Sequence, residues 1–447
     1  RLSNAMRKVL LLTGLLLTII LAACSATETV TPQPDTDAVE SLVSPSEAAE
    51  PTATSAPTPS ATPEESTIRI WHGWDETYSP ALVEIIAGFQ SNNPGVYFDV
   101  LYIPRENLLE RYIEATHAGD GSSLLLGPAE WGPILYDDGL ISDVNGLFSG
   151  ELLARFSPPA LEQGQYKSAQ LGLPNSLQGV VIYRNRSIIP ESADTFDDLL
   201  SLAASFTEGD TIGAVLERGF FYSGGHLDGI GGSLLGDDGL PEFNDVKGIE
   251  WVNLLQDFEL SGATTYLSDR DLELFGEGRV GIVIDGTWNL NDLAEAVGEQ
   301  DLVIDPWPTY GDDALSGYVQ SEHVFLNPNI SDHNLDATLL FVEYFSSPEA
   351  QTILAGVGFI PAVTDLQLTG EASQRHLTQA MIALAGGSGY PVVPEMSIYP
   401  AYMDQALRSI FELGAVPQDA LNAAEEAILQ EIEQMQETQE TQPQDGG

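Results

Sequence analysis

One short segment gathers several side chains that could do chemistry. In Ile70–Glu76, IWHGWDE, two Trp, a His and two carboxylates come directly after an apolar strand. Such a set could form a catalytic cluster, a metal site, or the rim of a pocket for a flat polar ligand. Trp74 and Asp75 favour the pocket rim, because an indole stacks on an apolar face while a carboxylate accepts hydrogen bonds. We expect Trp71 to point into the sheet, and His72 has no evident partner.

Motifs of the common enzyme classes are absent from the sequence. It contains no GxSxG elbow, no Walker loop, no HExxH and no GxGxxG after a strand. The six His residues are scattered, with no pair at helical spacing. We therefore expect no enzyme, no cofactor and no bound metal. A glycoside hydrolase stays open as an alternative, because 67 acidic residues could supply a carboxylate pair by chance.

Aromatic side chains follow several of the expected strands. In open α/β sheets ligands bind beyond the carboxyl ends of the strands, so these side chains are expected to converge on one cleft. Sugar rings have apolar faces that stack on flat aromatics, and hydroxyl edges that bond to acids and amides. The pattern therefore favours a carbohydrate site. The aromatic residues after strands are Trp71, Trp74, Trp131 (with the acid Glu130 before it), Phe220, Phe221, Tyr222 and Trp288, and Tyr399 and Tyr402 are expected in a Pro-rich loop around Pro400.

The elements that must position these residues alternate between strand and helix. Residues 67–71 and 96–103 are rich in branched residues and predict strands, and 123–126 predicts a buried strand. Between the first two, Ser79-Pro80 opens a helix whose apolar residues recur at helical spacing. This alternation predicts a parallel α/β sheet, and the length of 67–436 suggests two lobes.

The same pattern continues downstream. Thr195 and Asp198 predict a helix N-terminus with a capping box, and Ser347-Pro348 predicts another helix start. Residues 280–284 form an apolar strand. The final helix is marked by Leu421, Ala424, Ile428 and Ile432.

The N-terminal region has the features of an export signal. Residues 1–5 precede the first Met and are interpreted as a cloning remnant, and a basic, then apolar, run ends in Leu-Ala-Ala-Cys. Cys24 is the only cysteine, and this ending is similar to a bacterial lipobox, which predicts that Cys24 is acylated. Residues 1–23 would be removed, 24–66 would be a disordered Thr/Pro/Ser/Glu-rich tether, and 437–447 a disordered tail.

The composition is strongly acidic. The formal net charge is −51, and only Lys167 and Lys247 follow the signal region among the lysines. Nucleic acids and anionic membrane surfaces bind through basic patches, so the composition excludes both as partners.

Six sequence blocks in order resemble the bacterial extracellular solute-binding proteins of the maltose-binding type, over roughly 67–432. They are TIRIWHGWDE, SSLLLGPAEWGPILYDDGLISDV, YKSAQLGLPNSLQGVVIYRN with TFDDLL, FGEGRVGIVIDGTWNL, FSSPEAQTILAGVGFIPAV and VPEMSIYPAYMDQAL. The resemblance implies the two-lobe periplasmic-binding-protein fold (type II, Venus-flytrap). It implies an N-terminal lobe of 67–176 plus 318–357, and a C-terminal lobe of 177–317 plus 364–436. Hinge crossings are expected near Leu173–Leu177, Leu315–Val319 and Gly358–Val363.

The resemblance also assigns roles to residues. It places Asp75 and Glu130 on acids of the first two binding loops, Gln178 on the first crossing, and Trp288 on a stacking Trp. Glu76 stands where the maltose binder has a Lys, and Pro400 replaces an expected Trp, so the sugar is not assigned as maltose. The expected ligand contacts are Trp74, Asp75, Glu130, Trp131, Gln178, Phe221, Tyr222, Trp288, Tyr399 and Tyr402.

The function implied is that of a lipid-anchored, extracytoplasmic receptor. It would capture a sugar or oligosaccharide between the lobes and deliver it, as a monomer, to the transmembrane subunits of an ABC importer. Two alternatives stay open. The same scaffold could bind a polyol, polyamine or peptide, or the chain could be a surface-tethered glycoside hydrolase.

Overall fold

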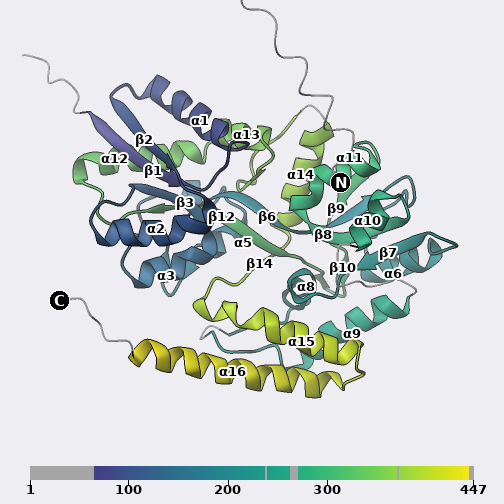
Figure 1. Ribbon diagram of the computed structural model, residues 1–447. Helices are drawn as coiled ribbons and strands as arrows, with labels where there is room; N and C mark the ends of the chain where they lie inside the picture. The colour runs from purple at the N-terminus through teal and green to yellow at the C-terminus, as the bar shows by residue number, and fades with distance from the viewer. Residues whose placement is uncertain (1–64, 237–238, 262–269, 370–371, 442–447) are drawn as a thin grey trace, which may run out of the picture. The chain divides into compact units, whose positions relative to one another are not determined.

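The computed structural model describes residues 65–236, 239–261, 270–369 and 372–441. In these residues, helices cover both faces of a ten-stranded mixed sheet, which runs β2-β1-β3-β12-β6-β8-β7 with three short strands alongside (Figure 1). Cys24, the export signal and the tether up to residue 64 lie outside the described residues, whereas Ser66, which was expected to belong to the tether, begins β1.

The first half of the sheet belongs to the N-terminal lobe. β1 pairs in parallel with β2 and β3, as the alternation of strand and helix predicts. β12 and β6 are antiparallel to their neighbours, so the sheet is mixed rather than purely parallel. The strands are β1 (Ser66–His72), β2 (Val96–Tyr102), β3 (Leu124–Pro128), β12 (Tyr318–Leu326) and β6 (Gly172–Asn185).

A single long strand connects this half to the next. The first part of β6 pairs with β12, up to Gly179 opposite Val319, and from Val180 it pairs with β8 instead. β8 pairs in parallel with β7, and β9 also pairs with the end of β6. These strands of the C-terminal lobe are β7 (Ile212–Leu216), β8 (Val280–Gly286) and β9 (Leu302–Asp305).

Strand alternation divides the N-terminal lobe into two cores. Leu124 and Leu126 of β3 face a core shared with α1, α12 and α13, whereas Leu125 faces a second core beneath α2 and α3. Figure 1 shows these helices on the two sides of the strands. They are α1 (Ser79–Asn92), α2 (Arg105–His117), α3 (Gly132–Asp137), α12 (Asp332–Phe345) and α13 (Pro348–Gly356).

The C-terminal lobe is layered in the same way. Ile282 and Ile284 of β8 pack with α6, α9, α15 and α16, and Val283 faces the core that α10, α11 and α14 cover. The helices are α6 (Phe196–Ser205), α9 (Val246–Leu260), α10 (Arg270–Gly276), α11 (Leu290–Val297), α14 (Ala372–Ala385), α15 (Tyr399–Phe411) and α16 (Pro417–Thr441).

Short elements complete the connections. β13 pairs with β6 at Leu177, and β14 pairs with the start of β12. The remaining elements are η1 (Ala129–Trp131), α4 (Gly150–Leu153), α5 (Pro158–Glu162), β4 (Gln165–Tyr166), β5 (Ala169–Gln170), α7 (Phe220–Ser223), α8 (Gly225–Gly229), η2 (Thr287–Asn289), β10 (Thr309–Tyr310), β11 (Asp313–Ala314), β13 (Ile360–Pro361), β14 (Ser388–Gly389) and η3 (Pro394–Ser397).

Local signals account for most helix ends. The capping box of α6 is present, and the Ser347 side chain accepts from the Ala350 N–H at the start of α13. Ser79 is not the N-cap of α1, since Tyr78 holds that position and Ser79 lies inside the helix. α16 continues to Thr441, past the expected end at 436. None of the described helices is long and apolar enough to cross a membrane.

A buried ion pair fastens β9 to β6. The Arg184 guanidinium donates to both carboxylate oxygens of Asp305, at 2.6 and 3.0 Å, and both side chains are less than a tenth exposed. Arg184 also donates to the carbonyls of Ile189 and Pro190. A bidentate pair with its remaining donors satisfied is the arrangement in which a buried charge is tolerated.

We expect Arg184→Met to lower the free energy of unfolding by about 3–5 kcal/mol, because Asp305 would stay buried without its counter-charge. A matched control is Arg186→Met, which breaks the half-exposed Arg186–Asp301 pair (3.8 Å) and should cost less than about 1 kcal/mol. Urea unfolding of the two variants measures the difference. Equal losses would show that burial of the pair is not what matters.

Candidate ligand-binding cleft

A hollow of about 350 Å³ lies where the two lobes meet. Residues from the N-terminal lobe, from the crossing segments and from the C-terminal lobe all border it. We call it the inter-lobe hollow, and its lining is Gly73, Trp74, Asp75, Tyr78, Arg105, Ser176, Leu177, Gln178, Thr287, Trp288, Glu322, Gly358, Phe359 and Ile360. Four of the expected contacts therefore border one cavity: Trp74, Asp75, Gln178 and Trp288.

Trp74 forms part of the wall of the hollow rather than an open platform. Its side chain is 5% exposed and packs against Phe359 (ring centroids 4.8 Å apart) and Phe345. The ring of Tyr78 lies 4.7 Å from Phe359 on the other side. The half-buried rings of Tyr78 and Phe359 are therefore the accessible part of this aromatic wall, and Trp74 backs it.

His72 and Trp71 support the same loop. Burial lowers the pKa of His72, and its Nδ1 accepts the backbone N–H of Trp74 at 3.2 Å. Trp71 packs edge-on against Tyr112 in the core under α2, as expected for a structural residue. The segment Ile70–Glu76 thus forms a pocket rim that Trp71 and His72 support from the core. His72 has a structural partner, the Trp74 N–H, that the sequence did not suggest.

Asp75 turns the chain into α1. Its Oδ1 accepts the Thr77 N–H at 2.8 Å, and its carbonyl accepts the Ser79 N–H at 2.9 Å. The side chain is exposed at the edge of the hollow, and its Oδ1 shapes the turn.

Trp288 faces this wall from the C-terminal lobe. It follows β8 within η2, and its side chain is 46% exposed. A Cβ on Gly286 would lie 2.0 Å from the indole ring, so only glycine allows the ring to fold back over the strand end. Asp285 Oδ1 accepts from Gly286 N (2.5 Å) and Asn289 Nδ2 (2.8 Å), which fixes the turn.

Further aromatic rings extend from Trp288 along the C-terminal lobe. Phe221 and Tyr222, in α7, have ring centroids 5.9 and 6.5 Å from Trp288. Tyr390, which follows β14, lies 5.6 Å from Phe221. Burial, with smaller contributions from the Glu130 and Asp404 charges, raises the pKa of Tyr390 to about 12, so its hydroxyl stays protonated. None of Phe221, Tyr222 and Tyr390 borders the inter-lobe hollow itself.

Glu130 and Gln178 are joined by a third residue. Gln178 Nε2 donates to Gln320 Oε1 at 3.4 Å, and Gln320 Nε2 donates to Glu130 Oε1 at 3.5 Å. Trp131 turns away, packing over Gly127 at the edge of the core beneath α2 and α3. Neither Glu130 nor Trp131 borders the inter-lobe hollow.

Tyr399 and Tyr402 also lie away from the hollow. Tyr399 is fully buried in the core of the C-terminal lobe, and its hydroxyl donates to the carbonyl of Gly239 at 3.0 Å. Tyr402 lies against α16, with its hydroxyl 3.4 Å from Glu431. Both belong to helix α15, not to the loop that Pro400 suggested, and the helical period turns them away from the hollow. This placement argues against ligand contact by either residue.

An ion pair forms the charged part of the hollow. Arg105 Nη1 lies 2.5 Å from Glu322 Oε1, and the side chains are 52% and 12% exposed. Burial raises the pKa of Glu322, the Arg105 charge opposes that rise, and Glu130 adds to it. Sequence reasoning missed both residues. Arg105 comes soon after the carboxyl end of β2, which is where ligand contacts are expected in open α/β sheets, so its position alone could have suggested it.

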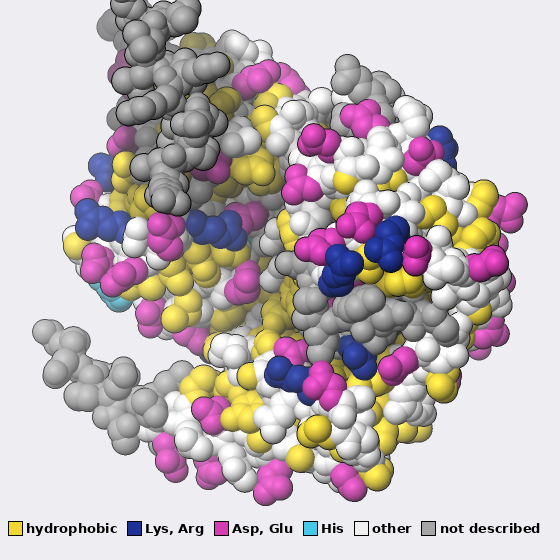
Figure 2. Space-filling view, turned by 45° about the vertical axis from the view of Figure 1, so that its right-hand side comes forward, with side chains coloured by type: hydrophobic (Ala, Val, Ile, Leu, Met, Phe, Trp, Pro, Cys, Tyr) yellow, Lys and Arg dark blue, Asp and Glu magenta, His cyan; other side chains and the backbone are white. Residues whose placement is uncertain are grey.

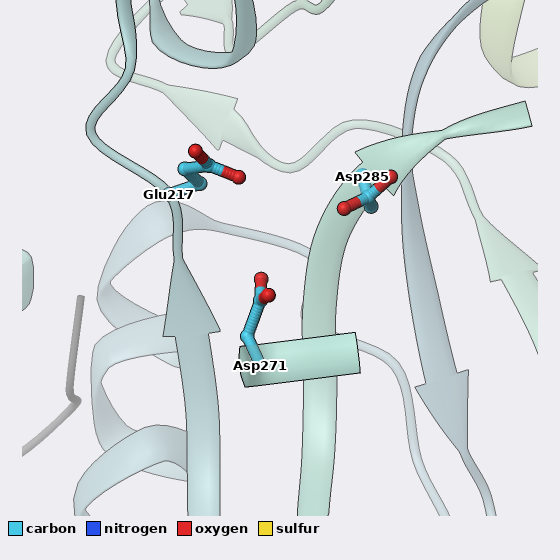
Figure 3. A group of neighbouring side chains, drawn as sticks. All are labelled: Glu217, Asp271 and Asp285. Atoms are coloured by element: carbon cyan, nitrogen blue, oxygen red, sulfur yellow. The ribbon is translucent and has the colours of Figure 1, made fainter. Parts of the chain in front are cut away.

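Three buried carboxylates meet behind the Trp288 turn. Glu217 follows β7, Asp271 lies on α10 and Asp285 is the penultimate residue of β8, and Figure 3 shows their carboxylates facing a common space. Their oxygens lie within 4.8 Å of one another. Oxygen donors of this kind suit Ca²⁺ or Mg²⁺. Carboxylates alone do not establish a metal site, and each of these residues has further contacts.

The charge of the visible surface follows the composition. Figure 2 shows Asp and Glu side chains spread over this face, with Lys and Arg in fewer, separate places. With 67 acidic against 16 basic residues, no part of the visible face offers the broad basic surface that a polyanion would need.

Comparison with known proteins identifies the family of this chain. Residues 84–379 match the family described as bacterial extracellular solute-binding protein. Similar relatives include a maltotriose-binding protein of Pyrococcus abyssi, 22% identical over 66% of this chain and 66% of its own length. Another is a maltooligosaccharide ABC transporter solute-binding lipoprotein of Streptococcus pneumoniae, 26% identical over 58% of this chain and 64% of its own. The matches thus span about two thirds of each relative.

Solved structures share the fold. An extracellular solute-binding protein from Staphylococcus aureus in complex with maltose has a TM-score of 0.74 at 21% identity, covering 83% of this chain and 99% of the other. The maltose-binding periplasmic protein MalE of Listeria monocytogenes has a TM-score of 0.70 at 19% identity, with coverages of 83% and 98%. The chain therefore belongs to the bacterial extracellular solute-binding protein family and has the two-lobe periplasmic-binding-protein fold.

Proposed function

We propose that this protein is the sugar receptor of an ABC importer and binds an uncharged sugar or oligosaccharide in the inter-lobe hollow. The observation that carries the proposal is the pairing of half-exposed Trp288 with the Tyr78–Phe359 wall across one cavity. Two aromatic faces can hold the apolar faces of a sugar ring, while Asp75 and Gln178 at its edge reach the hydroxyls.

The names of the relatives support this class of ligand. The P. abyssi and S. pneumoniae relatives are named for maltotriose and maltooligosaccharides, and the latter is named as part of an ABC transporter. A polyol, polyamine or peptide on the same scaffold is the competing hypothesis within binding. An aromatic wall with amide and carboxylate groups favours the sugar over these.

A carrier rather than a hydrolase is proposed for two reasons. The family consists of solute-binding proteins. Moreover, Glu322, the most buried carboxylate bordering the hollow, is engaged by Arg105, so it is not free to act as a general acid opposite Asp75. Release of glucose from maltotriose by the purified protein would contradict this part of the proposal.

We also propose that the lobes close on the ligand and that the protein is held at the membrane by acylated Cys24. The three expected crossings come together at β6, where Val319 pairs with Gly179 and Ile360 with Leu177. Few segments joining two lobes are typical of hinge closure.

The proposed lipid anchor is tested with Cys24→Ser, which should leave unprocessed precursor. A mature Cys24→Ser form that still partitions with membranes would contradict the anchor.

Titration of the protein with maltotriose, followed by Trp fluorescence, tests the ligand class. Stacking and short hydrogen bonds to an uncharged sugar have no long-range charge term, so the Kd should change less than about threefold between 0.01 M and 1 M salt, where the Debye length falls from about 30 to about 3 Å. A polyamine such as spermidine is the rival probe. Spermidine binding that weakens tenfold with salt, with no response to maltotriose, would overturn the sugar assignment.

Trp288→Ala should weaken maltotriose binding by about 2 kcal/mol or more, because aromatic anchors at the centre of a site carry that much binding energy. The melting temperature should hardly change, since the side chain is half exposed. Tyr402→Ala is the matched control, an aromatic truncation on α15 away from the hollow, and should leave the Kd unchanged. Calorimetry that finds equal affinities for wild type and Trp288→Ala would remove Trp288 from the site.

A further inference from the structure

The Arg105–Glu322 pair occupies an unusual position for an ion pair. Glu322 lies on β12 opposite Ser176 of β6, shortly after the expected crossing at Leu315–Val319, and it shares a strand face with Gln320, two residues earlier. The pairing register of β12 with β6 shifts between Glu322 and His323. Bulges of this kind recur beside functional sites, where they re-aim a side chain. Arg105 meets Glu322 from the first residue of α2.

The pair also determines the net charge of the hollow. Among the described residues that border it, Arg105 is the only Lys or Arg, and Asp75 and Glu322 are the acids. Glu130 is close enough to raise the pKa of Glu322. The single guanidinium is therefore outnumbered by carboxylates, and the nearest of them is in contact with it.

Arg105 retains hydrogen-bonding capacity toward the hollow. A guanidinium carries five N–H donors in a fixed fork, and one nitrogen of Arg105 is placed against Glu322. The described part of the chain shows no other ion pair for Arg105, and its side chain is half exposed where it borders the cavity. A carboxylate that holds one edge of the fork leaves the other edge oriented for a ligand oxygen.

We propose that Arg105 contacts hydroxyl groups of the sugar, and that Glu322 positions Arg105 and cancels its charge, so that the hollow selects uncharged over acidic sugars. This inference rests on the proposed function. In such a site the guanidinium donates to neutral oxygens, while the surrounding carboxylates oppose the entry of a uronate. Without Glu322, the same guanidinium would be an unneutralised cation facing the ligand.

The opposite role for Arg105, as an anchor for an acidic ligand, fits the site less well. Arginines that bind carboxylates use the fork in a bidentate manner, and here a protein carboxylate already occupies part of it. An incoming anion would also meet the charges of Asp75 and Glu130. The observations therefore favour discrimination against acids.

The test compares two probes on a small set of variants. The probes are maltotriose and the same trisaccharide with a carboxylate at C6 of its non-reducing unit. The variants are Arg105→Gln, Glu322→Gln and the conservative Glu322→Asp. Arg111→Gln is the matched control, since Arg111 lies on the same helix, pairs with Glu114 at 3.8 Å on the exposed side, and does not border the hollow. Melting temperatures are recorded for each variant.

Arg105→Gln should weaken maltotriose binding roughly tenfold, as expected for loss of a charge-assisted hydrogen bond. Glu322→Gln should raise the ratio of acidic to neutral affinity roughly tenfold, because the guanidinium charge is no longer neutralised. Glu322→Asp should restore part of the wild-type ratio, and Arg111→Gln should match wild type. A merely structural role for the pair would change stability without changing this ratio.

Two results would overturn the inference: an unchanged ratio in folded Glu322→Gln, or wild-type maltotriose affinity in Arg105→Gln. If Glu322→Gln does not fold, the ratio measured for Arg105→Gln decides, since it should fall relative to wild type. Wild-type protein that binds neither trisaccharide would instead contradict the proposed function itself, so the two failures are distinguishable.

Discussion

Backbone hydrogen bonding along β6 is the constraint on which both lobes depend. One continuous strand pairs with β12 in the N-terminal lobe and with β8 and β9 in the C-terminal lobe. Buried backbone groups must be paired, so β6 must begin to pair with β8 where its pairing with β12 ends. At the change of partner, a Cβ on Gly179 would lie 2.5 Å from the carbonyl of Tyr318, which requires glycine at this close approach.

This arrangement brings unlike surfaces together across the hollow. The turn after β8 carries Trp288, which is the aromatic side chain that borders the hollow from the C-terminal lobe. Strands β6 and β12 carry Gln178 and Glu322, so their side of the hollow, here called the floor, is polar. A ligand with apolar faces and a hydroxyl edge satisfies both, whereas a purely apolar ligand would leave the floor groups unpaired, which is costly.

Sequence reasoning was most successful where a local pattern reports directly on position. The capping box at Thr195 and Asp198 is a short-range signal, and the helix it predicted is present. Trp288 could be placed at the hollow because it follows an apolar strand and a glycine. Its contact with a ligand, like that of Trp74, Asp75 and Gln178, remains a prediction.

Positions that depend on long-range packing could not be predicted. Tyr399 was expected on a loop because Pro400 follows it, but proline is tolerated in the first turn of a helix, and α15 begins there. Phe359 reaches the hollow through the expected crossing at Gly358–Val363, and its ring neighbours Trp74 and Tyr78 are far away in sequence. Trp74 was expected at the pocket rim, and only the packing of Phe345 and Phe359 reveals that it backs the wall.

The proposed function requires a sugar ring to lie between Trp288 and the Tyr78–Phe359 wall. A crystal structure of the protein grown with maltotriose tests this most directly. We expect sugar density in the inter-lobe hollow, with one ring stacked on Trp288 and hydroxyls within hydrogen-bonding distance of Arg105. Density for the sugar at any other place, with the hollow holding only solvent, would contradict it.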